Sequence, residues 1–117
     1  MAARILSISY EPMLGQSRQW VLESEGYAVT TSASLEEAVR FCETGWFDVM
    51  VLGHCIPTAD KQRLIGVLRS VRATPVLALL EPGERQIAGA DYNLEALVSP
   101  EELTMAIKKI LAKAHAA

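Results

Sequence analysis

The chain has 117 residues, and its 14 acidic and 11 basic side chains give it a net charge of −3. This charge argues against a nucleic-acid-binding module, which usually carries a clustered basic face. Because half of the residues are hydrophobic, the chain is not a disordered tail, and it is long enough to bury a core. Its two cysteines, Cys42 and Cys55, are too few for a disulfide scaffold, and no apolar run approaches the roughly 18 residues of a membrane span. We therefore expect one soluble, cytoplasmic domain over residues 1–117 that does not bind membranes.

Five short apolar runs are spaced along the chain. Three of them are nearly unbroken, which is typical of parallel strands covered on both faces. Segments long enough for crossover helices separate the runs. The predicted strands lie within residues 5–8, 28–31, 49–52, 76–80 and 96–98.

Start and stop signals mark the predicted helices. Pro12 can open the first helix, and Gly26 stops it near Glu25. Residues 34–37 have the Ser-x-x-Glu spacing of a capping box, and residues 99–102 repeat it with a proline at the first helical position.

The final helix has an apolar stripe at helical spacing, which predicts the face that packs on the sheet. That stripe consists of Leu103, Ala106, Ile107, Ile110, Leu111 and Ala114. The opposite, solvent-facing side consists of Met105, Lys108, Lys109 and Ala112.

Strands and helices thus alternate five times, which predicts an α/β fold of three layers, α/β/α. A right-handed, doubly wound parallel sheet in the flavodoxin-like order 2-1-3-4-5 follows from this alternation. In such sheets, functional sites form where the strands end at their carboxyl edge. We therefore look for function in the loops at residues 9–12, 53–57, 81–83 and 99–100.

Several segments carry a family resemblance through their order and spacing rather than through any one motif. They are residues 4–12, 26–29, 36–39, 47–53 with Pro57, 75–79, 89–92 and 99–100. In this arrangement the whole chain resembles a CheY-like receiver domain of response regulators, the phosphoacceptor modules of bacterial two-component and phosphorelay signalling.

The functional positions of that family are altered here. The acidic pair that binds Mg²⁺ in the family falls on Ser9 and Tyr10, and the phosphoacceptor aspartate falls on Gly53. The switch Thr or Ser falls on Leu80, and the essential lysine falls on Ser99. Phosphoryl transfer to a carboxylate needs a nucleophilic oxygen, a cation on hard oxygen ligands and a positive group. Gly53 supplies no nucleophile, Ser9 and Tyr10 supply neutral hydroxyls where carboxylates are needed, and Ser99 supplies no charge. The resemblance therefore implies a pseudo-receiver without Mg²⁺ or another cofactor.

The segment before the fifth strand also departs from the family. Only residues 81–88 stand between Leu80 and Gly89, and Pro82-Gly83 favours a turn. We therefore predict a short helix four, of a turn or two at most.

Other polar residues near the predicted edge have weaker claims to a role. His54 and Cys55 suggest a metal or redox site, but the only other histidine is His115, so a loop histidine and a packed thiol are the preferred interpretation. Glu11 and Glu81 are preferred as a helix cap and a solvated acid rather than as cation ligands. We therefore predict neither catalytic nor metal-binding residues.

Three aromatic residues have open or structural interpretations. Tyr10 either plugs the emptied pocket or anchors a partner, and the sequence does not separate these roles. Trp20 and Trp46 are expected to pack in the core or between helix and sheet rather than to act as binding hot spots.

The predicted function is a non-enzymatic, phosphorylation-independent interaction module with no output domain in the chain. The partner would be a signalling protein or a second copy, bound at Met105, Lys108, Lys109 and Ala112 or at Tyr10. Two alternatives remain. One is a flavodoxin-like domain that binds a small ligand at the carboxyl ends of the strands. The other is an active receiver with a non-standard acceptor such as Ser9 or Ser99.

Overall fold

The computed structural model describes residues 2–95 and 99–116, and within these ranges five strands and four helices form. The strands are β1 (Arg4–Ile8), β2 (Ala28–Ser32), β3 (Val49–Leu52), β4 (Val76–Leu80) and β5 (Tyr92–Glu95). The helices are α1 (Pro12–Ser24), α2 (Leu35–Thr44), α3 (Thr58–Val71) and α4 (Pro100–Ala116). No helix of the described chain is long and apolar enough to cross a membrane.

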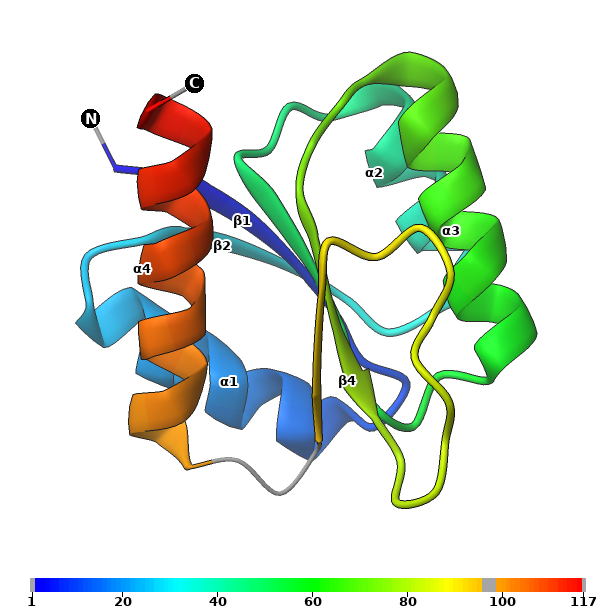
Figure 1. Cartoon of the computed structure of the whole chain (residues 1–117), viewed down its shortest axis with the longest axis horizontal. Coiled ribbons are helices and arrows are strands. Elements are labelled where there is room, and N and C mark those ends of the chain that lie inside the picture. The colour runs from blue at the N-terminus through cyan, green and yellow to red at the C-terminus, as the bar shows by residue number, and fades with distance from the viewer. Residues whose placement is uncertain (1, 96–98, 117) are drawn as a thin grey trace.

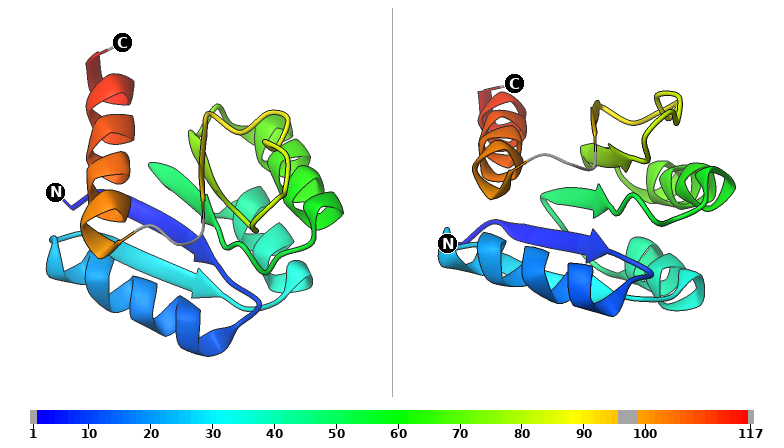
Figure 2. Two further views of the ribbon diagram at one scale, coloured as in Figure 1. Left: turned by 60° about the horizontal axis from the view of Figure 1, so that its bottom comes forward. Right: turned by 90° about the horizontal axis from the view of Figure 1, so that it is seen from below.

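The five strands form one parallel sheet in the order β2-β1-β3-β4-β5, as the sequence predicts. Helices α1 and α4 cover one face of the sheet, and α2 and α3 cover the other (Figures 1 and 2). The unbroken apolar runs of β3 and β4 are buried along their whole length because both of their faces meet helices.

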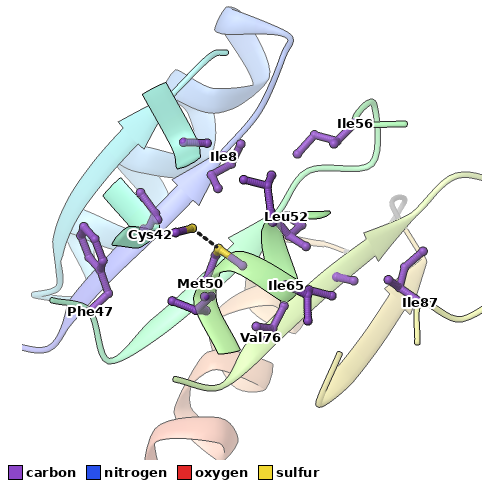
Figure 3. Close-up of a cluster of buried hydrophobic side chains, with 14 of the residues drawn as sticks. Ile8, Cys42, Phe47, Met50, Leu52, Ile56, Ile65, Val76 and Ile87 are labelled. Carbon is purple, nitrogen blue, oxygen red and sulfur yellow. Dashed lines mark hydrogen bonds between the residues drawn. The ribbon is translucent and has the colours of Figure 1, made fainter. Parts of the chain in front are cut away.

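Two clusters of buried side chains hold the layers together. The cluster between the sheet, α2 and α3 includes Ile8, Leu52 and Ile65, and the Cys42 thiol lies 3.6 Å from the sulfur of Met50 in its middle (Figure 3). Burial raises the pKa of Cys42 to about 11, with a smaller contribution from the negative charge of Glu43. This thiol is a packing group.

The helix ends follow the sequence signals. Helix α1 begins at Pro12, and Gly26 takes a φ of 91° just after it, a conformation that glycine adopts without steric cost. At α2, the Glu37 N–H donates to Ser34 Oγ at 3.2 Å. At α4 the box is reciprocal: the Glu102 N–H donates to Ser99 Oγ at 3.1 Å, and the Ser99 N–H donates to Glu102 Oε1 at 3.3 Å.

The segment between β4 and β5 differs from the prediction. The short helix predicted between Leu80 and Gly89 does not form, and residues 81–91 run in turns and irregular backbone. Gly83 and Gly89 take φ values of 83° and 88°, which a right-handed helix does not allow, and the Glu84 N–H closes a turn onto the Glu81 carbonyl at 2.9 Å.

The fifth strand lies earlier than predicted, at Tyr92–Glu95, and the predicted run at residues 96–98 lies outside the described residues. Asp91 fixes the start of this strand, because its Oδ2 accepts hydrogen bonds from the Val76 N–H at 2.7 Å and from Arg69 Nη2 at 2.6 Å.

Three further side chains are exposed against expectation. Ala114 is exposed because the last turn of α4 extends past the apolar cluster under it. Trp20 and Trp46 are exposed, at 63% and 53% of their surface, so neither is a core residue.

Candidate functional site

The carboxyl ends of β1 and β3 meet at the sheet edge where the sequence places the site. The Gly53 N–H donates to the Ile8 carbonyl at 2.8 Å, which brings the backbone of Gly53 against Ser9. Ser9 and Gly53 therefore lie together, and Tyr10 follows Ser9 in the loop after β1.

Gly53 is closely covered by its neighbours. A Cβ atom at this position would lie 2.9 Å from the Ile8 carbonyl oxygen and 3.0 Å from Arg18 Nη1. Both distances are shorter than normal carbon contacts, so a side chain here would require the Ile8 backbone to shift and the Arg18 guanidinium to move. The position onto which the family resemblance places the phosphoacceptor is here a point of close backbone approach.

The hydroxyl groups of Ser9 and Tyr10 both form hydrogen bonds within the protein. Ser9 is buried, donates to the Glu11 carbonyl at 2.9 Å and accepts from the Glu11 N–H at 3.3 Å. Tyr10 donates to Asp60 Oδ2 at 2.9 Å, which ties the loop after β1 to the first turn of α3. Burial, and then the hydrogen bond and negative charge of Asp60, raise the pKa of Tyr10 to about 12.

Arg18 reaches into this edge from α1. Its Nη2 lies 3.0 Å from Nδ1 of His54, and its Nη1 covers Gly53. Burial lowers the pKa of Arg18 from its usual value, and the nearby Cys55 partly opposes this shift. Arg18 therefore places a guanidinium group beside both Gly53 and His54.

A second positive charge lies deeper, between β3 and β4. The side chain of Lys61 is fully buried, and its Nζ donates to the Leu79 carbonyl at 2.8 Å and to Glu84 Oε1 at 2.7 Å. Burial acts to raise the pKa of Glu84, but hydrogen bonds from Lys61, Thr58 and the Glu81 N–H outweigh it, so this pKa lies below its usual value. Glu84 thereby fastens the loop after β4 to α3.

Sequence reasoning missed both Arg18 and Lys61. Each belongs to a helix and sits outside the loops where site residues were sought, and only its long side chain reaches the edge. The one available signal for Lys61 was its place on the apolar face of α3, three and four residues before the buried Leu64 and Ile65.

Leu80 and Ser99, the other two positions that the family resemblance points to, do not lie beside Ser9 and Gly53. Leu80 is buried in the cluster under α2 and α3, and Ser99 caps α4. Ser99 and Arg18 line one small cavity of about 230 Å³ between α1 and α4, together with Leu14, Ser17, Val21, Leu79, Pro100 and Leu103.

The structure also brings Glu81 beside His54 and Cys55, which the sequence suggested only as a pair. One ligand atom each of His54, Cys55 and Glu81 lies within 4.8 Å of the other two, at the ends of β3 and β4. Glu11 is not part of this group, and the side chain of His115 lies outside the described residues.

The predicted interaction surface on α4 is solvent-facing. Met105 is 57% exposed, and Lys108, Lys109 and Ala112 are exposed around it. A hollow of about 340 Å³ lies between this helix and β5, lined in part by Tyr92, Met105 and Lys109. Lys108 lies 3.8 Å from Glu25 of α1.

No family model matches the sequence. The transcriptional regulatory protein ResD of Bacillus subtilis (strain 168) is 26% identical over 117 residues, which cover 95% of this chain and 49% of ResD. The alkaline phosphatase synthesis transcriptional regulatory protein PhoP of the same strain is 30% identical over 124 residues, which cover 100% of this chain and 52% of PhoP. The chain thus spans about half the length of the curated relatives it matches.

The structure is similar to that of chemotaxis protein CheY4 of Vibrio cholerae, with a TM-score of 0.83 and 22% sequence identity. The similarity covers 95% of this chain and 100% of the CheY4 chain, and at this identity it concerns the fold. Strand order, and sequence similarity to response regulators over nearly the whole length, together identify the chain as a response-regulator receiver domain of the CheY-like type.

Proposed function

We propose that this receiver domain is a phosphorylation-independent, non-enzymatic interaction module of two-component signalling in the cytoplasm. The observation that carries the proposal is Gly53, whose backbone is packed against the Ile8 carbonyl oxygen and Arg18 at the phosphoacceptor position. Because Gly53 has no side chain, it offers no oxygen to accept a phosphoryl group. The Ile8 carbonyl oxygen and Arg18 Nη1 lie where its side chain would begin.

The arrangement around Gly53 also argues against Mg²⁺ binding. Hard cations bind several oxygen ligands, usually including carboxylates. At this edge Ser9 and Tyr10 offer neutral hydroxyls that are engaged with Glu11 and Asp60, and the guanidinium of Arg18 lies beside them. A resident positive charge repels a divalent cation, so we expect no tight Mg²⁺ binding.

Two charged contacts support a single resting conformation. Arg18 joins α1 to the loop after β3, and the pair of Lys61 and Glu84 joins α3 to the loop after β4. These are the loops that would have to move if phosphorylation changed the surface. With both loops fastened, the resting fold already presents its binding surface.

The binding surface we favour is the face of α4 around Met105. An exposed methionine flanked by lysines, next to a hollow against β5, has the mixture of apolar and charged groups found in modest protein interfaces. The partner would be a signalling protein or a second copy of the chain, rather than a nucleic acid or a membrane, because the net charge is −3.

The test is incubation with acetyl phosphate and with beryllofluoride, each with Mg²⁺, followed by intact-mass and fluorescence measurements beside a receiver that has the full acidic set. We expect no adduct and no Mg²⁺-dependent spectral change. A stoichiometric acyl phosphate would contradict the proposal. Labelling lost in Ser9→Ala or Ser99→Ala would instead identify a non-standard acceptor, and native mass spectrometry of protein from its source would reveal a retained small ligand.

A further inference from the structure

Three side chains with different ligand chemistry converge beside the former phosphorylation site. His54 and Cys55 lie in the loop after β3, and Glu81 follows β4 directly. Because β3 and β4 are neighbouring parallel strands, their ends meet at one edge, and the three ligand atoms lie within 4.8 Å of one another. Cys55 and Glu81 are exposed and His54 is half-buried, so an ion could reach the group from solvent.

The combination of an imidazole nitrogen, a thiol and a carboxylate selects a class of metal. Mg²⁺ and Ca²⁺ prefer sites made of oxygen alone, whereas Zn²⁺ binds nitrogen, thiolate and carboxylate ligands at about 2.0–2.3 Å in a tetrahedron. Ligand atoms in such a tetrahedron lie roughly 3.5 Å apart, so rotation of the exposed Cys55 and Glu81 side chains is enough to close the group. We infer that His54, Cys55 and Glu81 bind one Zn²⁺, with water as the fourth ligand.

Arg18 competes with the metal in this arrangement. A guanidinium group can only donate hydrogen bonds, so its contact at 3.0 Å makes Nδ1 of His54 the acceptor and leaves the ring proton on Nε2. One ring nitrogen is therefore occupied by Arg18 and the other by a proton. Zn²⁺ can bind Nδ1 only if Arg18 leaves, and it can bind Nε2 only if the proton moves to Nδ1, where Arg18 no longer fits.

Binding therefore exchanges one contact for another. The Cys55 thiol releases its proton to solvent, its sulfur and the other two ligands bind Zn²⁺, and Arg18 moves away from His54 and from the backbone of Gly53. This inference replaces the expectation that His54 and Cys55 have only packing roles, and it concerns a borderline ion rather than Mg²⁺. It is independent of the proposed lack of phosphorylation, since its readouts involve no phosphodonor.

The test is a titration of the whole chain with Zn²⁺ against a chromogenic chelator, and with Co²⁺ as an absorbing substitute. We expect one ion per chain and a thiolate-to-cobalt charge-transfer band, with Mg²⁺ unable to compete. Cys55→Ser, His54→Asn and Glu81→Gln should each weaken binding at least roughly tenfold, and Cys55→Ser should abolish the band. Arg18→Gln should tighten binding roughly tenfold, because it removes the nearby charge and replaces the competing guanidinium with a shorter, neutral donor.

Two control variants keep the test specific. Cys42→Ala removes the buried thiol, and His115→Ala removes the other imidazole; both should bind Zn²⁺ as the unchanged protein does, with folding checked by circular dichroism. Binding that survives in Cys55→Ser, or that disappears in His115→Ala, would overturn the site. Weaker binding in Arg18→Gln would overturn the competition.

Discussion

At the scale of single residues, the close contacts around Gly53 predict how much an added methyl group would lower the stability of the protein. Its missing Cβ would lie 2.9 Å from the Ile8 carbonyl oxygen, and this oxygen belongs to the sheet backbone and cannot easily move. We expect Gly53→Ala to lower the free energy of unfolding by about 1–3 kcal/mol, the usual cost of overpacking, in urea titrations. Gly66→Ala is the matched control, because Gly66 is an exposed residue of α3 and nothing lies within 4 Å of its Cβ position. This variant should be as stable as the unchanged protein or more stable.

The same position tests whether an aspartate alone is enough to accept a phosphoryl group. Gly53→Asp supplies a nucleophile, but Ser9 and Tyr10 still lack carboxylates, and Arg18 would pair with the new charge. Since such groups act as a unit, we expect no labelling of this variant by acetyl phosphate. Rapid labelling, or a Gly53→Ala variant as stable as Gly66→Ala, would show that the edge is looser than its contacts indicate.

How far the sequence predicts the site depends on the length of the side chain. Ser9 and Gly53 lie at the ends of β1 and β3, where the strand ends and loop spacing in the sequence put them, because the backbone alone fixes the place of a small residue. The sequence did not place Arg18 and Lys61 at this edge, since helical periodicity tells which face a residue lies on but not where a long, flexible side chain ends. The grouping of His54 and Cys55 with Glu81 needed the register of β3 against β4, which no local pattern contains.

At the scale of elements, the same distinction between local and non-local information holds. The signals at Ser34, Ser99 and Gly26 are local. Both hydrogen bonds of the capping box form at Ser99, one of the two forms at Ser34, and the stop at Gly26 lies where predicted. The segment from Glu81 to Asp91 is not local. Its conformation depends on Glu84 reaching Lys61 on α3 and on Asp91 reaching Arg69, so a short helix was predicted where turns are found.

The pair of Lys61 and Glu84 gives a prediction about these elements. Removing one partner of a buried pair leaves the other charge uncompensated, so Glu84→Gln should lower the free energy of unfolding by about 3 kcal/mol at neutral pH. Its pKa is lower in the folded chain, so this contribution is present above the unfolded value, near 4.3, and is lost as pH falls through the folded value. The difference between the two proteins should therefore shrink in acid.

Urea titrations across this pH range check the prediction, with Glu43→Gln, an exposed carboxylate on α2, as the control. That control should change stability by less than about 0.5 kcal/mol at every pH. A loss in Glu84→Gln that stays constant into acid would mean that the carboxylate is not charged in the folded protein.

At the scale of the whole molecule, the layers determine which surface is available to a partner. Helices α1 and α4 lie side by side on one face of the sheet, and α4 borders β5 at the edge of the sheet (Figure 2). The hollow between α4 and β5 is lined in part by Tyr92, Leu94 and Met105. No helix forms between β4 and β5. If no phosphoryl group switches the domain, as we propose, its binding surface must already be present in the resting fold. The hollow beside β5 meets this condition.

We therefore predict that Met105→Glu with Lys108→Glu abolishes partner binding or self-association. Both side chains are exposed, and Lys108 makes only a 3.8 Å contact with Glu25 at the surface, so the melting temperature should hardly change. Pull-down and analytical ultracentrifugation measure the binding, with Val71→Glu and Arg63→Glu as a control that makes the same change of charge on exposed positions of α3. A large drop in melting temperature would mean that the α4 side chains are packed. Unaltered binding by a stable double variant would move the interface to Tyr10 and the loop of His54 and Cys55, where Arg18→Gln would then be the next variant to measure.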